Sequence, residues 1–197
     1  MYGSPILSSV KPNTCIDKPY GVLMIDPPWP MRKGGLRKVR PNQGRELDYS
    51  TMSVESIFRL LDEDVFSLAA ERHSLFIWTV ESFLLACENM LQMRGYRRHC
   101  RLIWDKGNGM APCFSVRFAH EYLIWCYHGK FMPVAPHVRG KFLSVFHEAA
   151  RQHSRKPEIA YRLIEQLYPD ARRFDVFSRQ ARQGWDQYGN QPAFFNP

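Results

Sequence analysis

The sequence lacks the features that mark several large classes of protein. No apolar run approaches the roughly 20 residues that cross a bilayer, and the opening MYGSPIL has neither the basic region nor the apolar stretch of a secretion signal. The five cysteines are widely spaced without a CxxC pair, which argues against a disulfide framework and a zinc knuckle. The seven histidines show no HxH or HxxxH spacing. We therefore expect a cytoplasmic protein that is not attached to a membrane and binds no metal.

Internal repeats, low-complexity tracts and linker-like compositions are also missing. The 197 residues suffice for one compact unit, and an apolar content of 45% is enough to form its core. We expect a single domain over residues 1–197, in which residues 1–18 form an N-terminal extension and residues 30–50 form a long loop.

Acidic residues are few relative to basic ones. The 27 lysines and arginines outnumber the 19 aspartates and glutamates, so the net charge is +8. An excess of this size favours a polyanionic partner through phosphate contacts. Basic side chains gather in the loop at 30–50, where we expect them to contact the phosphates of a nucleic acid, and they are Arg32, Lys33, Arg37, Lys38, Arg40 and Arg45.

Apolar periodicity and turn residues divide the chain into alternating strands and helices. Strands are expected at Tyr20–Ile25, His73–Val80, Arg101–Trp104, His120–Tyr127 and Arg173–Phe177. Helices are expected from an N-cap at Ser53 through Leu61, over Glu81–Met93 with Gly95 closing it, and from Pro157 to a stop at Pro169. The tail through Gln191 is polar, with no strand expected. This alternation is typical of an α/β sheet.

The most informative residues are Asp26, Pro27, Pro28 and Trp29, which follow the first expected strand. A conjugated amine such as adenine N6 is a poor nucleophile, because its lone pair is delocalised into the ring. Two acceptors on the amine hydrogens draw that pair back onto nitrogen, and the Asp26 carboxylate and the Pro27 carbonyl suit this role. Trp29 offers a flat face for stacking a base. The tetrapeptide therefore predicts a site that activates a conjugated amine.

With these residues in place, the chain resembles the MT-A70 adenine methyltransferases. The resemblance runs from about Tyr20 to Gln191. It rests on motifs in the family's order, namely DPPW, LDYSTMS at 47–53, LFIW, RGYRRHCRLIWDKGNG, His120-Glu121, HSRKP at 153–157, FSR at 177–179 and GNQ at 189–191. It implies an α/β, Rossmann-like S-adenosylmethionine-dependent methyltransferase fold in one domain with permuted motif order. The absence of a GxGxxG loop upstream of Asp26 agrees with that order.

The chemistry of the residues and the resemblance together indicate which residues form the site, and the cofactor set is what the resemblance implies. The catalytic set is Asp26, Pro27, Pro28 and Trp29. The cofactor set is Asp26, Lys156, Asp175, Arg179, Asn190 and Gln191, with Lys156 paired to the methionine carboxylate of S-adenosylmethionine. The substrate set is Trp29, Arg32, Lys33, Arg37, Lys38, Arg40 and Tyr49. The chain departs from the family at Gln180-Ala181-Arg182, where relatives of the messenger-RNA enzyme carry His-Asn, so part of the cofactor shell is unmatched.

The expected activity is direct methyl transfer to N6 of an unpaired or flipped adenine. We place DNA ahead of RNA, because a compact chain that is short at both ends is more typical of a bacterial or phage enzyme. An RNA adenosine methyltransferase and a catalytically inactive nucleic-acid-binding subunit remain open alternatives. Methylation of cytosine N4 or of a protein amide also remains open, because those amines are conjugated in the same way.

Overall fold

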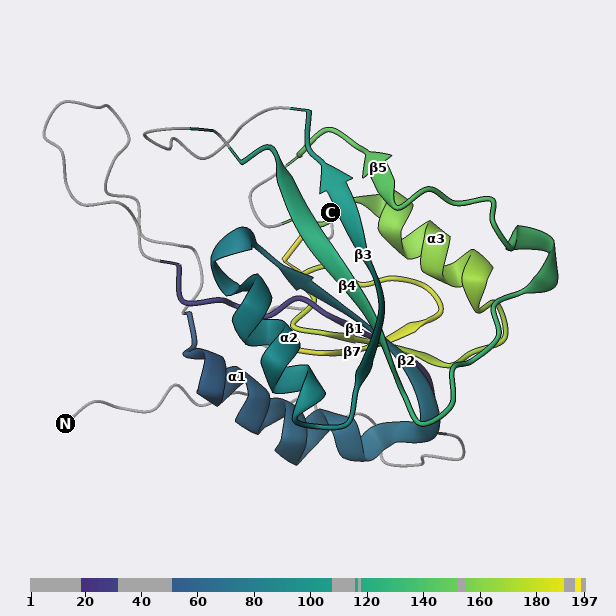
Figure 1. Cartoon of the computed structure of the whole chain (residues 1–197), viewed down its shortest axis with the longest axis horizontal. Helices are drawn as coiled ribbons and strands as arrows, with labels where there is room; N and C mark the ends of the chain where they lie inside the picture. Colours follow the sequence, from purple (N-terminus) through teal and green to yellow (C-terminus); the bar gives the residue numbers. More distant parts are fainter. Residues whose placement is uncertain are drawn as a thin grey trace, which may run out of the picture.

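A computed structural model describes residues 19–31, 51–107, 116, 118–151, 155–189 and 194–195. Within these residues one sheet has seven strands in the order β5-β3-β4-β2-β1-β6-β7, drawn in Figure 1. Their bounds are β1 (Tyr20–Ile25), β2 (Ala69–Thr79), β3 (Arg97–Asp105), β4 (His120–His128), β5 (Val145–His147), β6 (Arg173–Val176) and β7 (Trp185–Tyr188).

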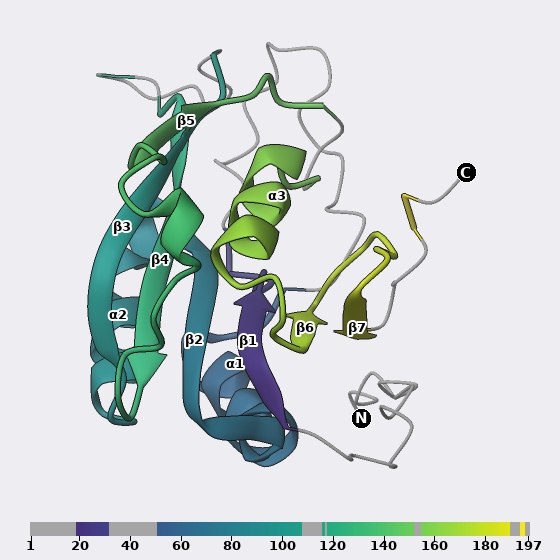
Figure 2. The same cartoon turned by 90° about the vertical axis from the view of Figure 1, so that its right-hand side faces the viewer.

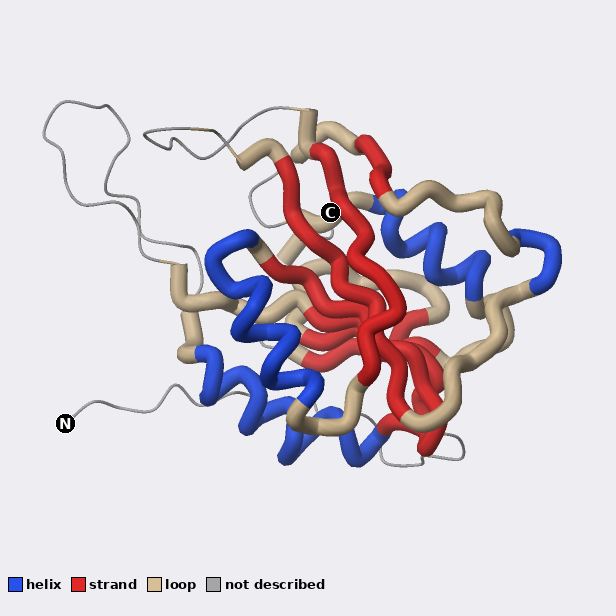
Figure 3. The backbone as a smooth tube through the Cα atoms, in the orientation of Figure 1, coloured by secondary structure: helices blue, strands red, loops and turns tan. Residues whose placement is uncertain are grey.

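Helices cover both faces of the sheet. Helices α1 (Val54–Leu60) and α2 (Leu84–Gln92) lie on one face and α3 (Glu158–Leu167) lies on the other, as Figures 1 and 2 show. Figure 3 shows the resulting layers, with blue helices on either side of the red strands. Short helical turns complete the described chain at η1 (Leu61–Val65), η2 (Phe66–Leu68), η3 (Glu81–Phe83) and η4 (Pro136–Val138). This architecture confirms the expected α/β fold.

Strand direction determines which residues meet at the edge of the sheet. Strand β4 is antiparallel to both of its neighbours, β2 and β3, while the other pairs in the described sheet are parallel. The amino end of β4 therefore lies beside the carboxyl ends of β2 and β3. In open α/β sheets, ligands bind outside the carboxyl ends of the parallel strands. We call this side of the sheet the carboxyl edge.

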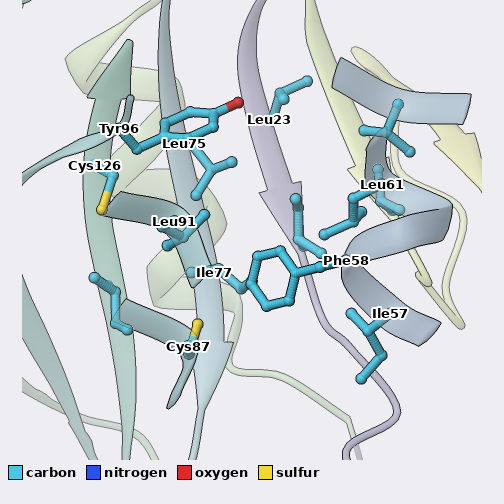
Figure 4. Close-up of a cluster of buried hydrophobic side chains, with 14 of the residues drawn as sticks. Leu23, Ile57, Phe58, Leu61, Leu75, Ile77, Cys87, Leu91, Tyr96 and Cys126 are labelled. Atoms are coloured by element: carbon cyan, nitrogen blue, oxygen red, sulfur yellow. The ribbon is translucent and has the colours of Figure 1, made fainter. Parts of the chain in front are cut away.

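The core has two halves because alternate residues of a strand face opposite sides. On the side of α1 and α2, Leu23 and Ile25 of β1 are fully buried, and Figure 4 shows Phe58 of α1 reaching toward Ile77 of β2. On the side of α3, Met24 of β1 is fully buried in a second cluster that also contains Ile164 of α3. Burying aliphatic and aromatic side chains on both faces stabilises the sheet by about 1.5–3 kcal/mol for each fully buried side chain.

Local sequence explains where the helices begin and end. The Ser53 hydroxyl accepts a hydrogen bond from the Ser56 backbone N–H at 3.1 Å, which is the N-cap expected for α1. Gly95 follows α2 with a φ of 80°, a backbone conformation that costs glycine little. Pro157 is the N-cap residue of α3, and its missing N–H costs no helical hydrogen bond there.

Several expected elements differ from the structure at their ends, and two strands were not expected. Strand β2 begins at Ala69 rather than His73, and β3 begins at Arg97 rather than Arg101, because pairing with neighbouring strands extends the ladder into polar sequence. The polar tail was expected to lack a strand, and this was wrong, since β7 pairs in parallel with β6. The other unexpected strand, β5, pairs in parallel with β3 at the opposite border of the sheet. No helix among the described residues combines the length and apolar character that a membrane crossing requires.

Candidate active site

Asp26 follows β1 directly and so lies at the carboxyl edge of the sheet. Its backbone N–H donates a hydrogen bond to the Val176 carbonyl at 3.0 Å, which joins it to the end of β6. Because alternate residues share a face, its side chain lies on the same side as that of Met24, the side that α3 covers. The fold thus places the Asp26 carboxylate beneath the start of α3.

A row of four alternating charges contains this carboxylate. The Lys156 ammonium lies 3.0 Å from Asp26 Oδ1 and 3.1 Å from Glu121 Oε2. The second Glu121 oxygen, Oε1, lies 2.6 Å from the Lys106 ammonium. All four side chains are less than a fifth exposed. At this burial each charge needs its partner, because an unpaired charge away from water is strongly unfavourable. We call Asp26, Lys156, Glu121 and Lys106 the charge row.

The protonation states in the charge row follow from burial and pairing. Burial raises the pKa of Asp26 to about 6, although the Lys156 charge opposes this rise. Burial lowers the pKa of Lys156, but the charges of Asp26 and Glu121 outweigh it and raise the pKa above its usual value. Burial also acts to raise the pKa of Glu121, yet the two lysines hold this pKa below its usual value. At neutral pH Asp26 and Glu121 are therefore carboxylates and Lys156 is an ammonium group.

The DPPW loop is held by backbone hydrogen bonds. The Pro27 carbonyl accepts from the Trp29 N–H at 2.8 Å, and the Pro28 carbonyl accepts from the Met52 N–H at 2.9 Å. A carbonyl oxygen has two lone pairs, so Pro27 retains one for a further donor. Backbone hydrogen bonds therefore hold the loop that carries Asp26 and the Pro27 carbonyl, and activation of an amine by these two acceptors stays a prediction.

Trp29 is more enclosed than a free stacking surface. Its side chain is 6% exposed, its indole N–H donates to the Trp78 carbonyl at 2.9 Å, and its ring stacks on Phe83 with centroids 5.4 Å apart. The residue anchors the loop to β2 and to η3. Stacking of a base on Trp29 stays a prediction.

The candidate cofactor residues Asp175 and Arg179 lie on and just after β6, next to β1. Asp175 pairs with Met24 in the sheet and is fully buried. Burial raises its pKa to about 7, against the opposing influence of the Ser178 hydroxyl. Neither carboxylate oxygen of Asp175 makes a hydrogen bond of regular geometry within the described chain. The Arg179 guanidinium lies over the Phe194 ring, 3.8 Å from its centroid.

The connection after β6 is unusually tight. Phe177 has a φ of 63°, which is rare for a residue other than glycine, and its N–H donates to the Tyr188 carbonyl. Gly189 packs against the same turn, since a Cβ there would lie 3.3 Å from Phe177 Cα. This close approach joins the ends of β6 and β7 and sets the path of the chain into Arg179.

The remaining expected site residues lie outside the described residues. These are the substrate candidates Arg32, Lys33, Arg37, Lys38, Arg40 and Tyr49 and the cofactor candidates Asn190 and Gln191. Of the residues expected from the sequence, the structure brings Asp26 and Lys156 into direct contact. Arg179 lies close enough to Asp26 to lower its pKa, and Asp26 lies close enough to Asp175 to raise the pKa of Asp175.

Sequence reasoning assigned no role to Glu121, Lys106 or Glu148. Glu121 opens the apolar strand sequence HEYLIWCY, and an acidic residue at the end of a buried strand was the available signal. The two Glu148 carboxylate oxygens accept the backbone N–H groups of Glu158 and Ile159 at 2.9 and 3.0 Å, which caps α3. No local sequence pattern links Glu148 to α3, because the two come from separate elements.

The chain is similar in sequence to several N(6)-adenosine-methyltransferases of plants and animals. The chain is 29% identical over 181 residues to the N(6)-adenosine-methyltransferase MT-A70-like protein of Arabidopsis thaliana, covering 87% of this chain and 24% of that protein. It is 27% identical over 186 residues to the N(6)-adenosine-methyltransferase catalytic subunit METTL3 of Homo sapiens, covering 87% of this chain and 28% of that protein. It is 28% identical over 186 residues to the MT-A70-like protein of Drosophila melanogaster, covering 87% of this chain and 27% of that protein.

The chain thus spans about a quarter of the length of these relatives. They come from plants and animals, so they give no support to the expected bacterial or phage source. MT-A70 methyltransferases use S-adenosylmethionine as the methyl donor. The MT-A70 family model matches residues 20–191, nearly all of the sequence over which the motifs were recognised, and the chain belongs to the MT-A70 family.

Proposed function

We propose that this chain transfers a methyl group from S-adenosylmethionine to the exocyclic N6 of adenine in a nucleic acid. The observation that carries the proposal is the contact between Asp26, on the rigid DPPW loop, and Lys156, at the start of α3, 3.0 Å apart at the carboxyl edge. Membership of the MT-A70 family and the names of the relatives support the same chemistry.

The residues present suit the cofactor. The methionine half of S-adenosylmethionine carries an ammonium and a carboxylate, and the Asp26–Lys156 pair offers the two complementary charges side by side. The buried Asp175 carboxylate, which lacks a hydrogen bond of regular geometry within the described chain, suits the hydroxyl donors of a ribose. When bound, the cofactor supplies an electrophilic methyl group on a positively charged sulfur.

The chain's own residues prepare the amine. The ionised Asp26 carboxylate and the Pro27 carbonyl accept hydrogen bonds from the two N6 hydrogens. These bonds draw the lone pair out of the ring and back onto the nitrogen. A cofactor held by Asp26 and Lys156 would supply the methyl group to this amine, and its sulfur would keep the electron pair of the carbon–sulfur bond. N6 loses one proton after the transfer, and the Asp26 carboxylate is placed to take it. A pKa of about 6 suits Asp26 to this work near neutral pH.

DNA and RNA are both candidate substrates. The excess of basic residues favours a polyanion without separating the two. The ranking of DNA above RNA has no support in the relatives, whose names refer to adenosine, the ribonucleoside. The experiment below therefore includes both.

The test uses purified protein, labelled S-adenosylmethionine, and DNA and RNA oligonucleotides of matched sequence, followed by digestion and identification of the methylated nucleoside. Asp26→Asn is compared with the control Asp62→Asn. The Asp62 side chain lies away from the site and forms an ion pair with Arg94 at 2.6 Å. We expect N6-methyladenine from the wild type and from Asp62→Asn, and a loss of about 100-fold or more in Asp26→Asn.

Each other outcome changes the proposal. Label on cytosine would exclude adenine as the target. Equal label from Asp26→Asn would remove this residue from the mechanism. Binding of the oligonucleotide with no label in any variant would indicate a nucleic-acid-binding subunit and overturn the proposed activity.

A further inference from the structure

We propose that Glu121 is a positioning residue that holds the Lys156 ammonium in place for the carboxylate of the bound methionine group, with Lys106 holding Glu121 in turn. This inference rests on the proposed function, because it assigns Lys156 to the cofactor. It adds Glu121 of β4 and Lys106, which follows β3 directly, to which sequence reasoning assigned no role.

The geometry of Glu121 is that of a support between two cations. Its Oε2 lies 3.1 Å from Lys156 Nζ and its Oε1 lies 2.6 Å from Lys106 Nζ, so both carboxylate oxygens are engaged. The Glu121 side chain is 14% exposed and comes from β4, where its backbone pairs with Trp104 of β3. Strand β4 is paired on both sides, with β2 and β3, so its backbone has less freedom than a loop. Glu121 is therefore a fixed point to which the flexible Lys156 side chain is attached.

Lys156 needs such a support once Asp26 has another task. Asp26 is the other carboxylate in contact with Lys156 within the described chain, and the reaction requires Asp26 to accept hydrogen bonds from an amine. When Asp26 binds its ligand, Glu121 still neutralises the Lys156 ammonium, whose side chain is 12% exposed. The Trp78 ring, with its centroid 5.5 Å from Lys156 Nζ, adds a favourable contact on one side. Lysine has four rotatable bonds, and holding them before binding lowers the entropic cost of binding.

If only the number of charges mattered, removing Glu121 would strengthen binding of a ligand carboxylate, which is the opposite of the effect that we propose. The charge row has two negative and two positive groups, so Glu121→Gln leaves it with an excess positive charge. If charge alone mattered, this excess would attract a ligand carboxylate more strongly. If Glu121 positions Lys156, the freed ammonium instead pairs with Asp26 alone, and binding of the carboxylate weakens. The sign of the change in affinity distinguishes the two.

The experiment measures binding without catalysis. Isothermal titration calorimetry is carried out with S-adenosylhomocysteine and with 5′-methylthioadenosine, which lacks the amino-acid ammonium and carboxylate. We expect Glu121→Gln to weaken S-adenosylhomocysteine binding about tenfold and to leave 5′-methylthioadenosine binding within about twofold of the wild type. The matched control is Glu88→Gln, because the Glu88 side chain of α2 is 15% exposed and also bridges two cations, Arg98 and Arg101 of β3. It should leave both affinities unchanged.

The remaining outcomes separate this inference from the proposed function. Failure of the wild type to bind S-adenosylhomocysteine would overturn the cofactor assignment and this inference with it. Normal binding by the wild type, with equal or tighter binding by Glu121→Gln, would overturn the inference alone. Equal weakening of both ligands would show general damage to the pocket and would also overturn it. If Glu121→Gln does not fold, Lys106→Met replaces it, with a smaller selective loss for S-adenosylhomocysteine expected and no loss contradicting the proposal.

Discussion

The Nζ atom of Lys156 lies 3.0 Å from Oδ1 of Asp26, although the two residues come from segments far apart in the sequence. Strand β1 delivers Asp26 to the carboxyl edge of the sheet, and the segment before α3 brings Lys156 to the same place. The two opposite charges therefore meet at the position where an α/β sheet binds its ligands.

The first prediction concerns pH. Burial raises the pKa of Asp26 from 3.8 to about 6, against the charges of Lys156 and Arg179 and with that of Glu121. The reaction requires the ionised form, which is the form above the pKa. We expect kcat/KM, which reports the free enzyme, to be constant above pH 7 and to fall about tenfold for each pH unit below 6. A profile of kcat/KM against pH measures this, and a midpoint near 4 would contradict the raised pKa of Asp26.

The second prediction concerns Asp175. Its pKa of about 7 in the folded protein exceeds the ordinary value of 3.8, so folding favours the protonated form, and the free energy of unfolding decreases as pH rises from about 4 to about 7. Asp175→Asn removes this cost. We expect it to raise the free energy of unfolding by about 2 kcal/mol at pH 8 and by less at pH 5. Denaturant unfolding at the two pH values measures the difference, and an equal gain at both would show that ionisation is not its cause.

The same variant should bind the cofactor more weakly, because an amide cannot offer two acceptor oxygens to ribose hydroxyls. Calorimetry with S-adenosylhomocysteine gives the affinity. Greater stability with reduced affinity would identify Asp175 as a residue retained for binding at a cost in stability.

The third prediction concerns the cap of α3. Both Glu148 oxygens accept N–H groups from the first turn of this helix, which begins two residues after Lys156. Glu148→Gln loses one acceptor and the favourable charge at the helix N-terminus. We expect the free energy of unfolding to fall by about 1–2 kcal/mol and cofactor affinity to fall with it. Glu55→Gln, an exposed acidic residue in the first turn of α1, is the control and should change stability by less than about 0.5 kcal/mol.

The fourth prediction concerns the turn between β6 and Arg179. A Cβ at Gly189 would lie 3.3 Å from Phe177 Cα and 3.4 Å from the Ser178 carbonyl oxygen, so Gly189→Ala forces this turn to move. We expect a loss of about 1 kcal/mol in the free energy of unfolding and a several-fold loss of cofactor affinity. Gly21→Ala, whose new Cβ would make an ordinary contact with Ala171, is the comparison. Similar affinities for the two variants would show that the turn does not shape the cofactor site.

Most of the fold could be predicted from the sequence, because its strands and helices carry strong apolar patterns. Strand β1 matches its expected bounds, and Ser53 caps α1 as expected. Strands β5 and β7 could not be predicted in the same way. Strand β5 has three residues, of which the middle one is buried. Strand β7 has four residues, with a buried aromatic residue at each end and two polar residues between them. Both exist because a neighbouring strand offers hydrogen-bonding groups, which is information that no local pattern contains.

The site could be predicted in part. An acidic residue followed by two conformationally restricted prolines indicates Asp26, and the motif HSRKP indicates Lys156. The contact between Glu121 and Lys106 depends on the pairing of β3 with β4, which brings the end of one strand beside the start of the other. No local sequence pattern predicts this pairing. The burial of Trp29 could not be predicted either, because its contacts with Trp78 and Phe83 join three separate elements.

The reversed direction of β4 has a consequence for how members of this family could diverge. Asp105 of β3 pairs with His120 of β4, so the segment joining these strands leaves and re-enters the sheet beside the charge row. Insertions or deletions there would leave the register of the hairpin unchanged. A change in the length of this connection therefore leaves in place Lys106 and Glu121, the two residues of the charge row that lie at its ends.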